Sequence, residues 1–178
     1  MINKYQKLAS ESVFNGLVFE VIRDHVKLPS GKEMKRDTLL HPGAVVVLPK
    51  LDTDKLVLVR QYRHSVGKDI LEFPAGTLES GEDPKNCVQR ELREEIGYGA
   101  EQIQSLGTNL PAPGFCNELQ HFYFATNLFP EKLAGDDDEI LEVEYLTVTE
   151  IESLICSGDF LDGKSMAIFL KARLLGLI

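Results

Sequence analysis

Tryptophan is absent from this chain of 178 residues, and cysteine is scarce. Disulfide frameworks in small secreted proteins usually hold an even number of cysteines, and structural zinc sites usually hold C-x-x-C pairs. Neither pattern is present, because the three cysteines lie far apart at Cys87, Cys116 and Cys156. The sequence therefore predicts no disulfide framework and no zinc site, and it favours a reducing, cytoplasmic compartment.

Long hydrophobic runs are also missing. Residues 1–10, MINKYQKLAS, have no apolar core of the length found in signal peptides. No segment approaches the roughly 20 apolar residues of a membrane-spanning helix. We therefore expect a soluble protein with no membrane partner.

Positive charge is in deficit. The chain has 19 Lys and Arg residues against 28 Asp and Glu residues, a formal net charge of −9. Nucleic acids and anionic membranes attract basic surfaces, so neither is expected as the main partner. An anionic substrate would need local help from metal ions and a few arginines.

A helix is well specified within residues 76–98, which read GTLESGEDPKNCVQRELREEIGY. Asp83 can cap its first turn, Pro84 suits the first helical position, and Gly97 suits a left-handed C-terminal cap. The sequence therefore predicts a helix over residues 83–97, preceded by a tight, glycine-framed loop.

Three glutamates lie close together on this helix. Glu91 and Glu95 stack one turn apart on the same face, and Glu94 lies one step round from them. Like charges at this spacing destabilise a helix, so the arrangement favours binding of a divalent cation. The alternative is a solvated face with internal ion pairs, in which Arg90 would pair with Glu94.

The spacing of the whole segment supports the first interpretation. From Gly76 to Gly97 it reads G-x5-E-x7-R-E-L-x-E-E-x-G. This pattern resembles the signature of the Nudix hydrolases position by position. It departs only at Tyr98, where the family usually has an aliphatic residue.

The resemblance extends beyond this motif to the ADP-ribose pyrophosphatase branch of the family. Residues 60–63, RQYR, and 71–76, LEFPAG, look like the approach to the motif in that branch. Pro113 lies sixteen residues after Gly97, as in members of that branch, and residues 138–144 look like their second catalytic segment. The likeness covers most of the chain.

The remaining pattern predicts mostly strands. Strands are expected at residues 13–27, 33–40, 44–48, 56–62, 119–128 and 140–146, and helices at residues 147–158 and from Asp162 onward. A capping box of Thr147 and Glu150 would start the first of these helices. This pattern predicts an α+β or α/β sandwich, in which helices flank a mixed β-sheet.

The resemblance implies the same architecture, an α/β/α sandwich of the Nudix type with an N-terminal antiparallel β-hairpin. We therefore divide the chain into an N-terminal β subdomain, residues 1–40, and a Nudix catalytic domain, residues 41–178. In related pyrophosphatases the hairpin is exchanged or packed across a two-fold dimer and contributes to the partner's site. This implies a homodimer here, with Arg36 as a candidate for a contact across the dimer.

Cleavage of a pyrophosphate bond requires a water in line with one phosphorus and neutralisation of charge on the phosphate oxygens. A divalent cation supplies both. Hard oxygen ligands on Glu91, Glu95 and Glu94 suit Mg²⁺, for which Mn²⁺ can substitute. The resemblance adds the carbonyl of Ala75 as a ligand and Glu82 as a support at the edge of the metal site.

The catalytic set implied by the resemblance comprises Arg90, Glu94 and Glu95 of the motif and a general base. The metal-binding carboxylates are poorly suited to be the base, because they are already ligands. The acidic run DDDE offers a free carboxylate, and in similar enzymes a glutamate of this region approaches the attacking water. We predict Glu139 as the base, with Asp138 second. The alternative is a solvated turn.

Substrate contacts are expected from residues on both sides of the motif. Arg63 and Arg60 can clamp phosphate oxygens, although their odd spacing along a strand lets only one of them face a cleft. Arg63 matches the phosphate-binding arginine of the family better. Glu72 and Glu118 can accept hydrogen bonds from ribose hydroxyls or hold metal-bound waters, and Phe115 can line the pocket. Each of these residues can equally be structural.

The predicted function is hydrolysis of ADP-ribose, or of a similar nucleotide sugar such as GDP-mannose, to a nucleoside monophosphate and a sugar phosphate. Without tryptophan, stacking on the base would fall to Phe or Tyr, with Phe14 and Phe19 as candidates.

Two alternatives to this function stay open. The substrate can be another nucleoside diphosphate derivative, such as a dinucleotide, or a nucleoside triphosphate. The chain can also be a non-catalytic module that binds a nucleotide sugar.

Overall fold

The computed structural model describes residues 4–134 and 140–178. The chain forms two compact units, one of Met1–Gly43 and Leu110–Leu119 and the other of Ala44–Asn109 and Gln120–Ile178. The functional division predicted at residue 40, into a dimerising part and a catalytic part, stays a prediction. Within the described residues, no helix has the length and hydrophobicity that would let it span a membrane.

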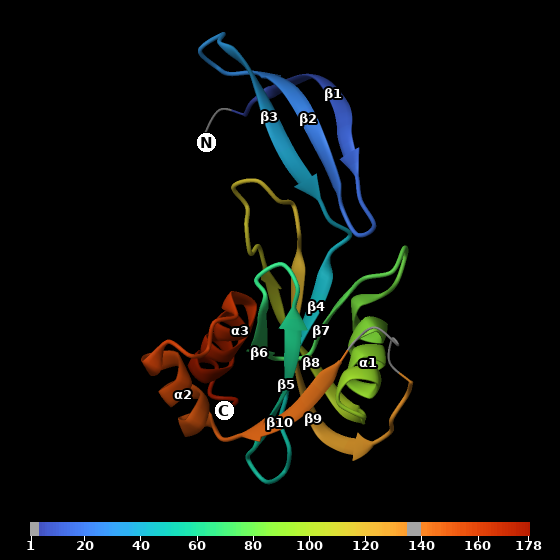
Figure 1. Cartoon of the computed structure of the whole chain (residues 1–178), viewed down its shortest axis with the longest axis vertical. Helices are drawn as coiled ribbons and strands as arrows, with labels where there is room; N and C mark the ends of the chain where they lie inside the picture. The colour runs from blue at the N-terminus through green and yellow to red at the C-terminus, as the bar shows by residue number, and fades with distance from the viewer. Residues whose placement is uncertain (1–3, 135–139) are drawn as a thin grey trace. The chain divides into compact units, whose positions relative to one another are not determined.

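The first unit contains an antiparallel sheet of three strands, drawn in blue in Figure 1. Its order is β1 (Gln6–Asn15), β2 (Glu20–Lys27) and β3 (Glu33–Leu40). The single strand predicted over residues 13–27 is wrong, because the chain turns at Gly16, whose N–H donates to the carbonyl of Phe19 at 2.9 Å. A Cβ atom at Gly16 would lie 2.9 Å from the ring of Phe14, so a side chain there would force that ring to shift.

The described residues of the second unit form seven strands in two sheets: β4 (Ala44–Pro49), β5 (Leu56–Arg63), β6 (Lys68–Glu72), β7 (Ala75–Thr77), β8 (Tyr98–Asn109), β9 (Gln120–Pro130) and β10 (Leu141–Leu146). One sheet has the order β7-β4-β9-β8 and the other the order β10-β5-β6. The pair β4 and β9 is parallel, while the pairs β4 and β7, β8 and β9, β5 and β6, and β5 and β10 are antiparallel. The unit is therefore built on mixed β-structure.

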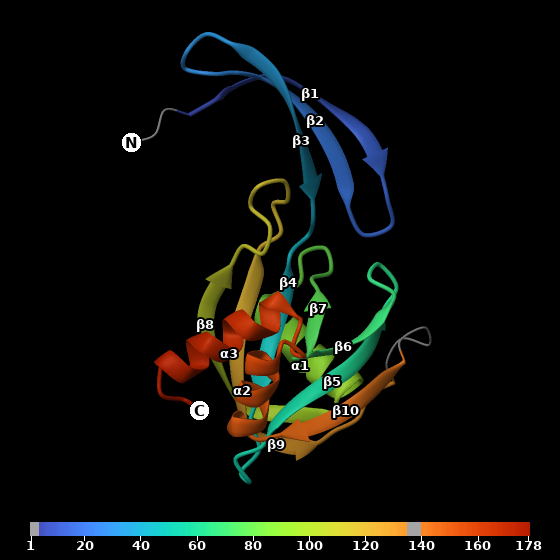
Figure 2. The ribbon, with the colours of Figure 1, turned by 60° about the vertical axis from the view of Figure 1, so that its left-hand side comes forward.

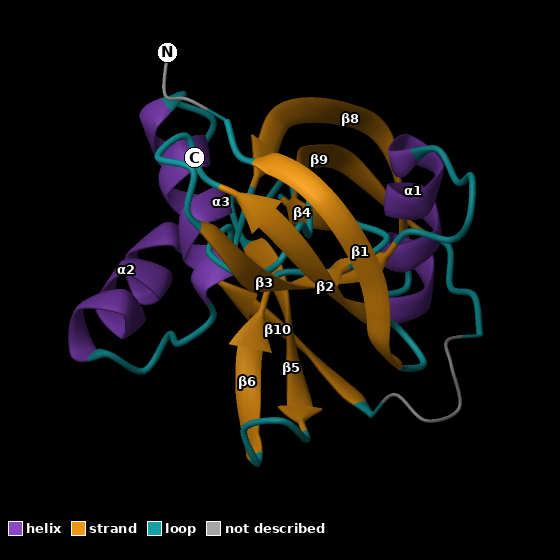
Figure 3. Cartoon of the chain, turned by 90° about the horizontal axis from the view of Figure 1, so that it is seen from above, coloured by secondary structure: helices purple, strands orange, loops and turns teal. Residues whose placement is uncertain are grey.

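Helices cover these sheets on two sides. They are α1 (Pro84–Glu95), α2 (Val148–Ser157) and α3 (Gly163–Leu174). Figures 1 and 3 show α1 on one side of the sheets and α2 and α3 on the other, and Figure 2 shows α2 and α3 in front of β4. The predicted α+β fold, a mixed sheet flanked by helices, is confirmed.

Local capping signals predicted the helix ends closely. Asp83 caps α1, and Gly97, two residues beyond its end, has a positive φ of 75°. Thr147 and Glu150 form the predicted capping box at the start of α2. These ends depend on hydrogen bonds between residues close in sequence, which is why the sequence reveals them.

β4 is buried along its whole length and serves both cores of the second unit. Val45 and Val47 pack in a cluster with apolar residues of α1, while Val46 and Leu48 pack in another cluster with apolar residues of α2 and α3. Successive strand residues point to opposite faces, so an unbroken apolar run becomes a shared central strand. The buried strand predicted over residues 44–48 is confirmed.

β8 is a strand that the apolar pattern does not reveal. Polar residues with low strand propensity, such as Glu101 and Gln102, interrupt it, and its buried apolar side chains are Ala100 and Leu106. Antiparallel pairing with β9 runs along its whole length. Backbone hydrogen bonds to a neighbouring strand, rather than its own side chains, therefore maintain it.

Candidate active site

β7 brings the glycine-framed loop against α1. A Cβ atom added to Gly76 would lie 1.7 Å from Glu91 Oε1, far inside the 3.0 Å limit of real Cβ contacts. A side chain at this position would occupy the space that the Glu91 carboxylate fills. The first glycine of the motif therefore makes room for Glu91 beside the strand.

Glu95 contacts the same strand from the next turn of α1. Its Oε2 accepts a hydrogen bond from the N–H of Ala75 at 3.1 Å. Glu91 and Glu95 are each 7% exposed, so two carboxylates are held next to the loop backbone in a largely buried position. The structure thus brings together three residues predicted to hold a metal, Ala75, Glu91 and Glu95.

Arg90 lies at the centre of the motif carboxylates. Its Nη1 donates to Glu91 Oε1 at 2.7 Å and to Glu94 Oε2 at 3.1 Å. Its Nε and Nη2 donate to the two oxygens of Glu82, each at 3.2 Å. The hydrogen bonds with Glu82 are the main cause that raises the pKa of Arg90, and they lower the pKa of Glu82. One guanidinium therefore offsets the repulsion among three carboxylates.

Cys87 lies against this cluster, although the sequence assigns no role to it. Its Sγ is 3.3 Å from Arg90 Nη2 and 4.0 Å from Glu91 Oε1, and the side chain is fully buried. Burial, followed by the charge of Glu91, raises the pKa of the Cys87 thiol to about 12. The thiol is therefore neutral at neutral pH and adds no negative charge beside the carboxylates. Cys87 lies four residues before Glu91 on the same helix, and this spacing was the sequence signal that could have predicted their contact.

A second polar cluster lies where β5, β6 and the start of α3 meet. Glu72 is 2% exposed, and its oxygens accept from Arg63 Nε at 2.8 Å and Arg63 Nη2 at 2.7 Å. Lys164 Nζ donates to Glu72 as well, and to Asp162 Oδ2 at 3.0 Å. Burial by itself would raise the pKa of Glu72, but Arg63 and Lys164 together lower it. The Glu72 carboxylate is therefore ionised at neutral pH.

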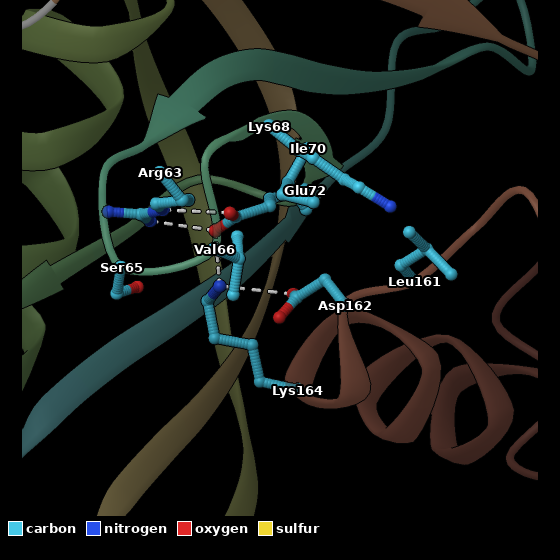
Figure 4. A pocket seen from close by; sticks show the side chains of 9 residues that line it. All are labelled: Arg63, Ser65, Val66, Lys68, Ile70, Glu72, Leu161, Asp162 and Lys164. Carbon is cyan, nitrogen blue, oxygen red and sulfur yellow. Dashed lines mark hydrogen bonds and ion pairs between the residues drawn. The ribbon is translucent and has the colours of Figure 1, made fainter.

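This cluster lines a pocket with a volume of about 510 Å³. Figure 4 shows the Glu72 carboxylate between Arg63 and Lys164. The lining residues are Arg63, Ser65, Val66, Lys68, Ile70, Glu72, Leu161, Asp162 and Lys164. Glu72 is the main cause of the raised pKa of Arg63, and the charge of Glu95 adds to it. The second cluster is therefore linked electrostatically to the carboxylates of α1.

Hard carboxylate oxygens near a guanidinium are the groups that handle metal-bound phosphates. A family model described as the NUDIX domain matches residues 40–163, which is more than half of the chain. The chain belongs to the Nudix family. The hydrolase family predicted from the motif is thereby confirmed, and Nudix hydrolases generally use divalent metal ions.

Curated Nudix relatives match most of the chain. An ADP-ribose pyrophosphatase of Bacillus subtilis is 38% identical over 160 residues, which cover 89% of this chain and 86% of that protein. A protein named methanol dehydrogenase activator, of Bacillus methanolicus, is 40% identical over 161 residues, covering 89% and 87%. The solved structure of an ADP compounds hydrolase matches with a TM-score of 0.89 and 26% identity, covering 98% of this chain and 95% of that one.

The two arginines of β5 hold different partners in this Nudix chain. Arg60 Nε donates to Glu144 Oε1 on β10 at 2.6 Å, whereas Arg63 pairs with Glu72. Of the two, Arg63 lines the pocket described above. Substrate binding by Arg60, Arg63 and Glu72 stays a prediction.

Three further residues predicted to bind substrate, Arg36, Phe115 and Glu118, belong to the first unit. The loop that carries Phe115 is joined to β3, because the carbonyl of Phe115 accepts from the N–H of Leu39 at 2.8 Å. The side chain of Phe115 is 63% exposed. The roles of these three residues stay predictions.

The predicted base, Glu139, and the second candidate, Asp138, lie outside the described residues. Among the residues that are described, no group of three or more Asp, Glu, His or Cys side chains is arranged so that it could hold a metal ion. Glu82, Glu91 and Glu94 each form an ion pair with Arg90 instead.

The donor set nevertheless fits a hard divalent cation. Glu91 and Glu95 supply buried carboxylate oxygens beside the backbone of Ala75, and Mg²⁺ and Mn²⁺ prefer such ligands. The contact with Gly76 keeps the Glu91 carboxylate next to that backbone. A cation at this place would replace part of the charge compensation that Arg90 now provides.

Proposed function

We propose that this Nudix hydrolase cleaves the pyrophosphate bond of ADP-ribose or a related nucleoside diphosphate sugar, giving a nucleoside monophosphate and a sugar phosphate. The observation that carries the proposal is the buried pair Glu91 and Glu95, held against the backbone of residues 75 and 76. The names of the ADP-ribose pyrophosphatase and ADP compounds hydrolase relatives support the substrate class.

Mg²⁺ is the proposed cofactor, and Mn²⁺ can substitute for it. Glu91, Glu95 and the carbonyl of Ala75 would hold the cation, with Glu94 and Glu82 at the edge of the site. When bound, the cation neutralises charge on the phosphate oxygens and activates the attacking water. The separation of about one helical turn between Glu91 and Glu95 lets both carboxylates reach the same side of the loop.

Arg90 would act by holding the carboxylates in place. Its hydrogen bonds keep Glu82, Glu91 and Glu94 together before a cation arrives. Because these contacts raise its pKa, Arg90 keeps its charge throughout the working pH range. Arg63 would bind phosphate oxygens with Nη1, since Nε and Nη2 form its pair with Glu72.

Proton removal from the attacking water is assigned to Glu139, with Asp138 as the second candidate. Arg60, Glu72, Phe115, Glu118 and Arg36 are proposed as further substrate contacts. These assignments rest on the resemblance of the sequence to the ADP-ribose pyrophosphatase branch.

A homodimer is proposed as the working form, in the cytoplasm. The ten residues of β1 are all exposed, and β1 is an edge strand of its sheet. Exposed edge strands are surfaces on which another chain can pair. Large apolar side chains on this strand, Val13 at 43% and Phe14 at 54% exposure, would lose contact with water in such a pairing.

The test is a Mg²⁺-dependent panel of ADP-ribose, GDP-mannose, NADH, dinucleoside polyphosphates and nucleoside triphosphates. Wild type should prefer a nucleoside diphosphate sugar, and Glu95→Gln should lower kcat by about 100-fold or more, since loss of even an outer-shell partner of a metal site costs about 10- to 100-fold. Glu139→Gln should lower kcat while leaving Mn²⁺ binding unchanged. Undiminished turnover in Glu95→Gln would refute the metal assignment. A preference for triphosphates or dinucleotides would refute the substrate class, and binding without turnover would indicate a non-catalytic module.

A further inference from the structure

Residues 72–75 join β6 to β7. Each of them forms a hydrogen bond or ion pair with a residue that is distant in sequence. Glu72 pairs with Arg63 and Lys164. The N–H of Phe73 donates to Ser165 Oγ at 2.8 Å, the carbonyl of Pro74 accepts from Val47 N–H at 2.9 Å, and the N–H of Ala75 donates to Glu95 Oε2 at 3.1 Å. This segment is therefore fixed from several elements at once.

Two of these partners, Lys164 and Ser165, are neighbours in the first turn of α3. Asp162, the N-cap residue of that helix, accepts from both of them: from Lys164 Nζ and from the Ser165 N–H, each at 3.0 Å. The cap that starts α3 thus also orients the two residues that contact Glu72 and Phe73.

These contacts are shielded from water. Ser165 and Phe73 are fully buried, and Glu72 is 2% exposed. A buried N–H that loses its acceptor is costly, because water cannot replace it. Opposite charges alternate along the line from Arg63 through Glu72 and Lys164 to Asp162, as Figure 4 shows.

We infer that the first turn of α3 positions the metal-binding loop: Ser165 fixes the backbone that leads to the Ala75 carbonyl, and Lys164 fixes Glu72 and thereby Arg63. The inference rests on the proposed function only for the identity of Ala75 and Arg63 as ligands. Lys164 and Ser165 are positioning residues, since neither is placed on the substrate. A displacement of about 1 Å at a reacting centre can lower a rate by about 100-fold.

The experiment compares wild type with Ser165→Ala, Lys164→Met and Lys164→Arg. Lys171→Met is the matched control, because Lys171 lies on the same helix two turns further along. Three quantities are measured: hydrogen exchange of the backbone amides of residues 72–77 apart from Pro74, which has no N–H, the affinity for Mn²⁺ alone by electron paramagnetic resonance, and kcat and KM for the best nucleotide sugar.

In Ser165→Ala, amide exchange of residues 72–77 should accelerate by about tenfold, because the Phe73 N–H loses its acceptor. Its Mn²⁺ affinity should fall several-fold, and kcat should fall by about 10- to 100-fold with KM little changed. Lys164→Met should raise KM as well, because Glu72 would lose its contact with Lys164 and would hold Arg63 less firmly. Lys164→Arg should recover most of the loss, and Lys171→Met should match wild type.

Wild-type exchange and Mn²⁺ affinity in folded Ser165→Ala and Lys164→Met would overturn the inference. So would an equal loss in Lys171→Met. If Ser165→Ala does not fold, Lys164→Met decides, because Lys164 lies nearer the surface at 15% side-chain exposure. Failure of wild type to hydrolyse any nucleotide sugar would refute the proposed function instead, and the exchange and Mn²⁺ measurements would still decide the inference.

Discussion

Replacement of Gly76 by alanine should move the Glu91 carboxylate. The new Cβ atom would lie 1.7 Å from Glu91 Oε1, 1.9 Å from Cδ and 2.6 Å from Cγ. The Glu91 side chain must give way, but it is buried and bonded to Arg90 at 2.7 Å. Overpacking of this kind costs about 1–3 kcal/mol. Activity should fall by about 10- to 100-fold, the range seen when the support of a metal site is disturbed, because a proposed metal ligand is displaced.

A double-mutant cycle measured by urea unfolding tests this reasoning. Gly76→Ala should destabilise wild type by about 1–3 kcal/mol, and it should cost much less in a Glu91→Ala background, where the obstructing carboxylate is gone. Gly163→Ala is the control, because a Cβ atom there meets nothing within 4 Å and should be neutral or slightly stabilising. An equal cost of Gly76→Ala in both backgrounds would refute the steric account.

Three further predictions concern Glu72, Thr147 and Cys87. The folded-state pKa of Glu72 is lowered, so its stabilising contribution is present above its unfolded pKa and is lost as pH falls through the folded pKa. Urea unfolding should therefore show a stability gap between wild type and Glu72→Gln that is largest at neutral pH and shrinks in acid; a gap independent of pH would contradict this. Thr147→Ala removes the capping box of α2 and should cost about 1 kcal/mol by the same assay, whereas Thr147→Ser should cost much less. The buried Cys87 thiol, with its pKa raised to about 12, should react with a thiol reagent only after unfolding, while the exposed Cys156 reacts in the native protein; rapid native labelling of Cys87 in a Cys116→Ser, Cys156→Ser background would show that the site opens readily.

Elements with local signals were predictable from the sequence. α1 needs only Asp83, Pro84 and Gly97 to define its ends, and each acts on residues within a few positions. The apolar run in β4 indicates a buried strand in the same way. The spacing of the motif further places Glu91 and Glu95 on one helix face, because helical geometry alone decides which residues share a face.

Elements that depend on distant partners were not predictable. β8 is maintained by its pairing with β9, and its own polar residues conceal it. Lys164 and Ser165 carry no local signal beyond the cap of α3, and they meet Glu72 and Phe73 across 92 positions of sequence. The turn at Gly16 was missed because strand-forming residues continue on both sides of it.

The sequence alone determined the family, the carboxylate helix and the reaction class, because these follow from spacing along one short segment. Tertiary structure decided how the carboxylates are held. It placed Gly76 so close to Glu91 that residue 76 cannot carry a side chain. It also joined Glu95 to the backbone of Ala75 by a hydrogen bond, and it brought three carboxylates into ion pairs with Arg90. The physical reason is that burial and hydrogen bonding at this site are shared among strands and helices that only folding brings together.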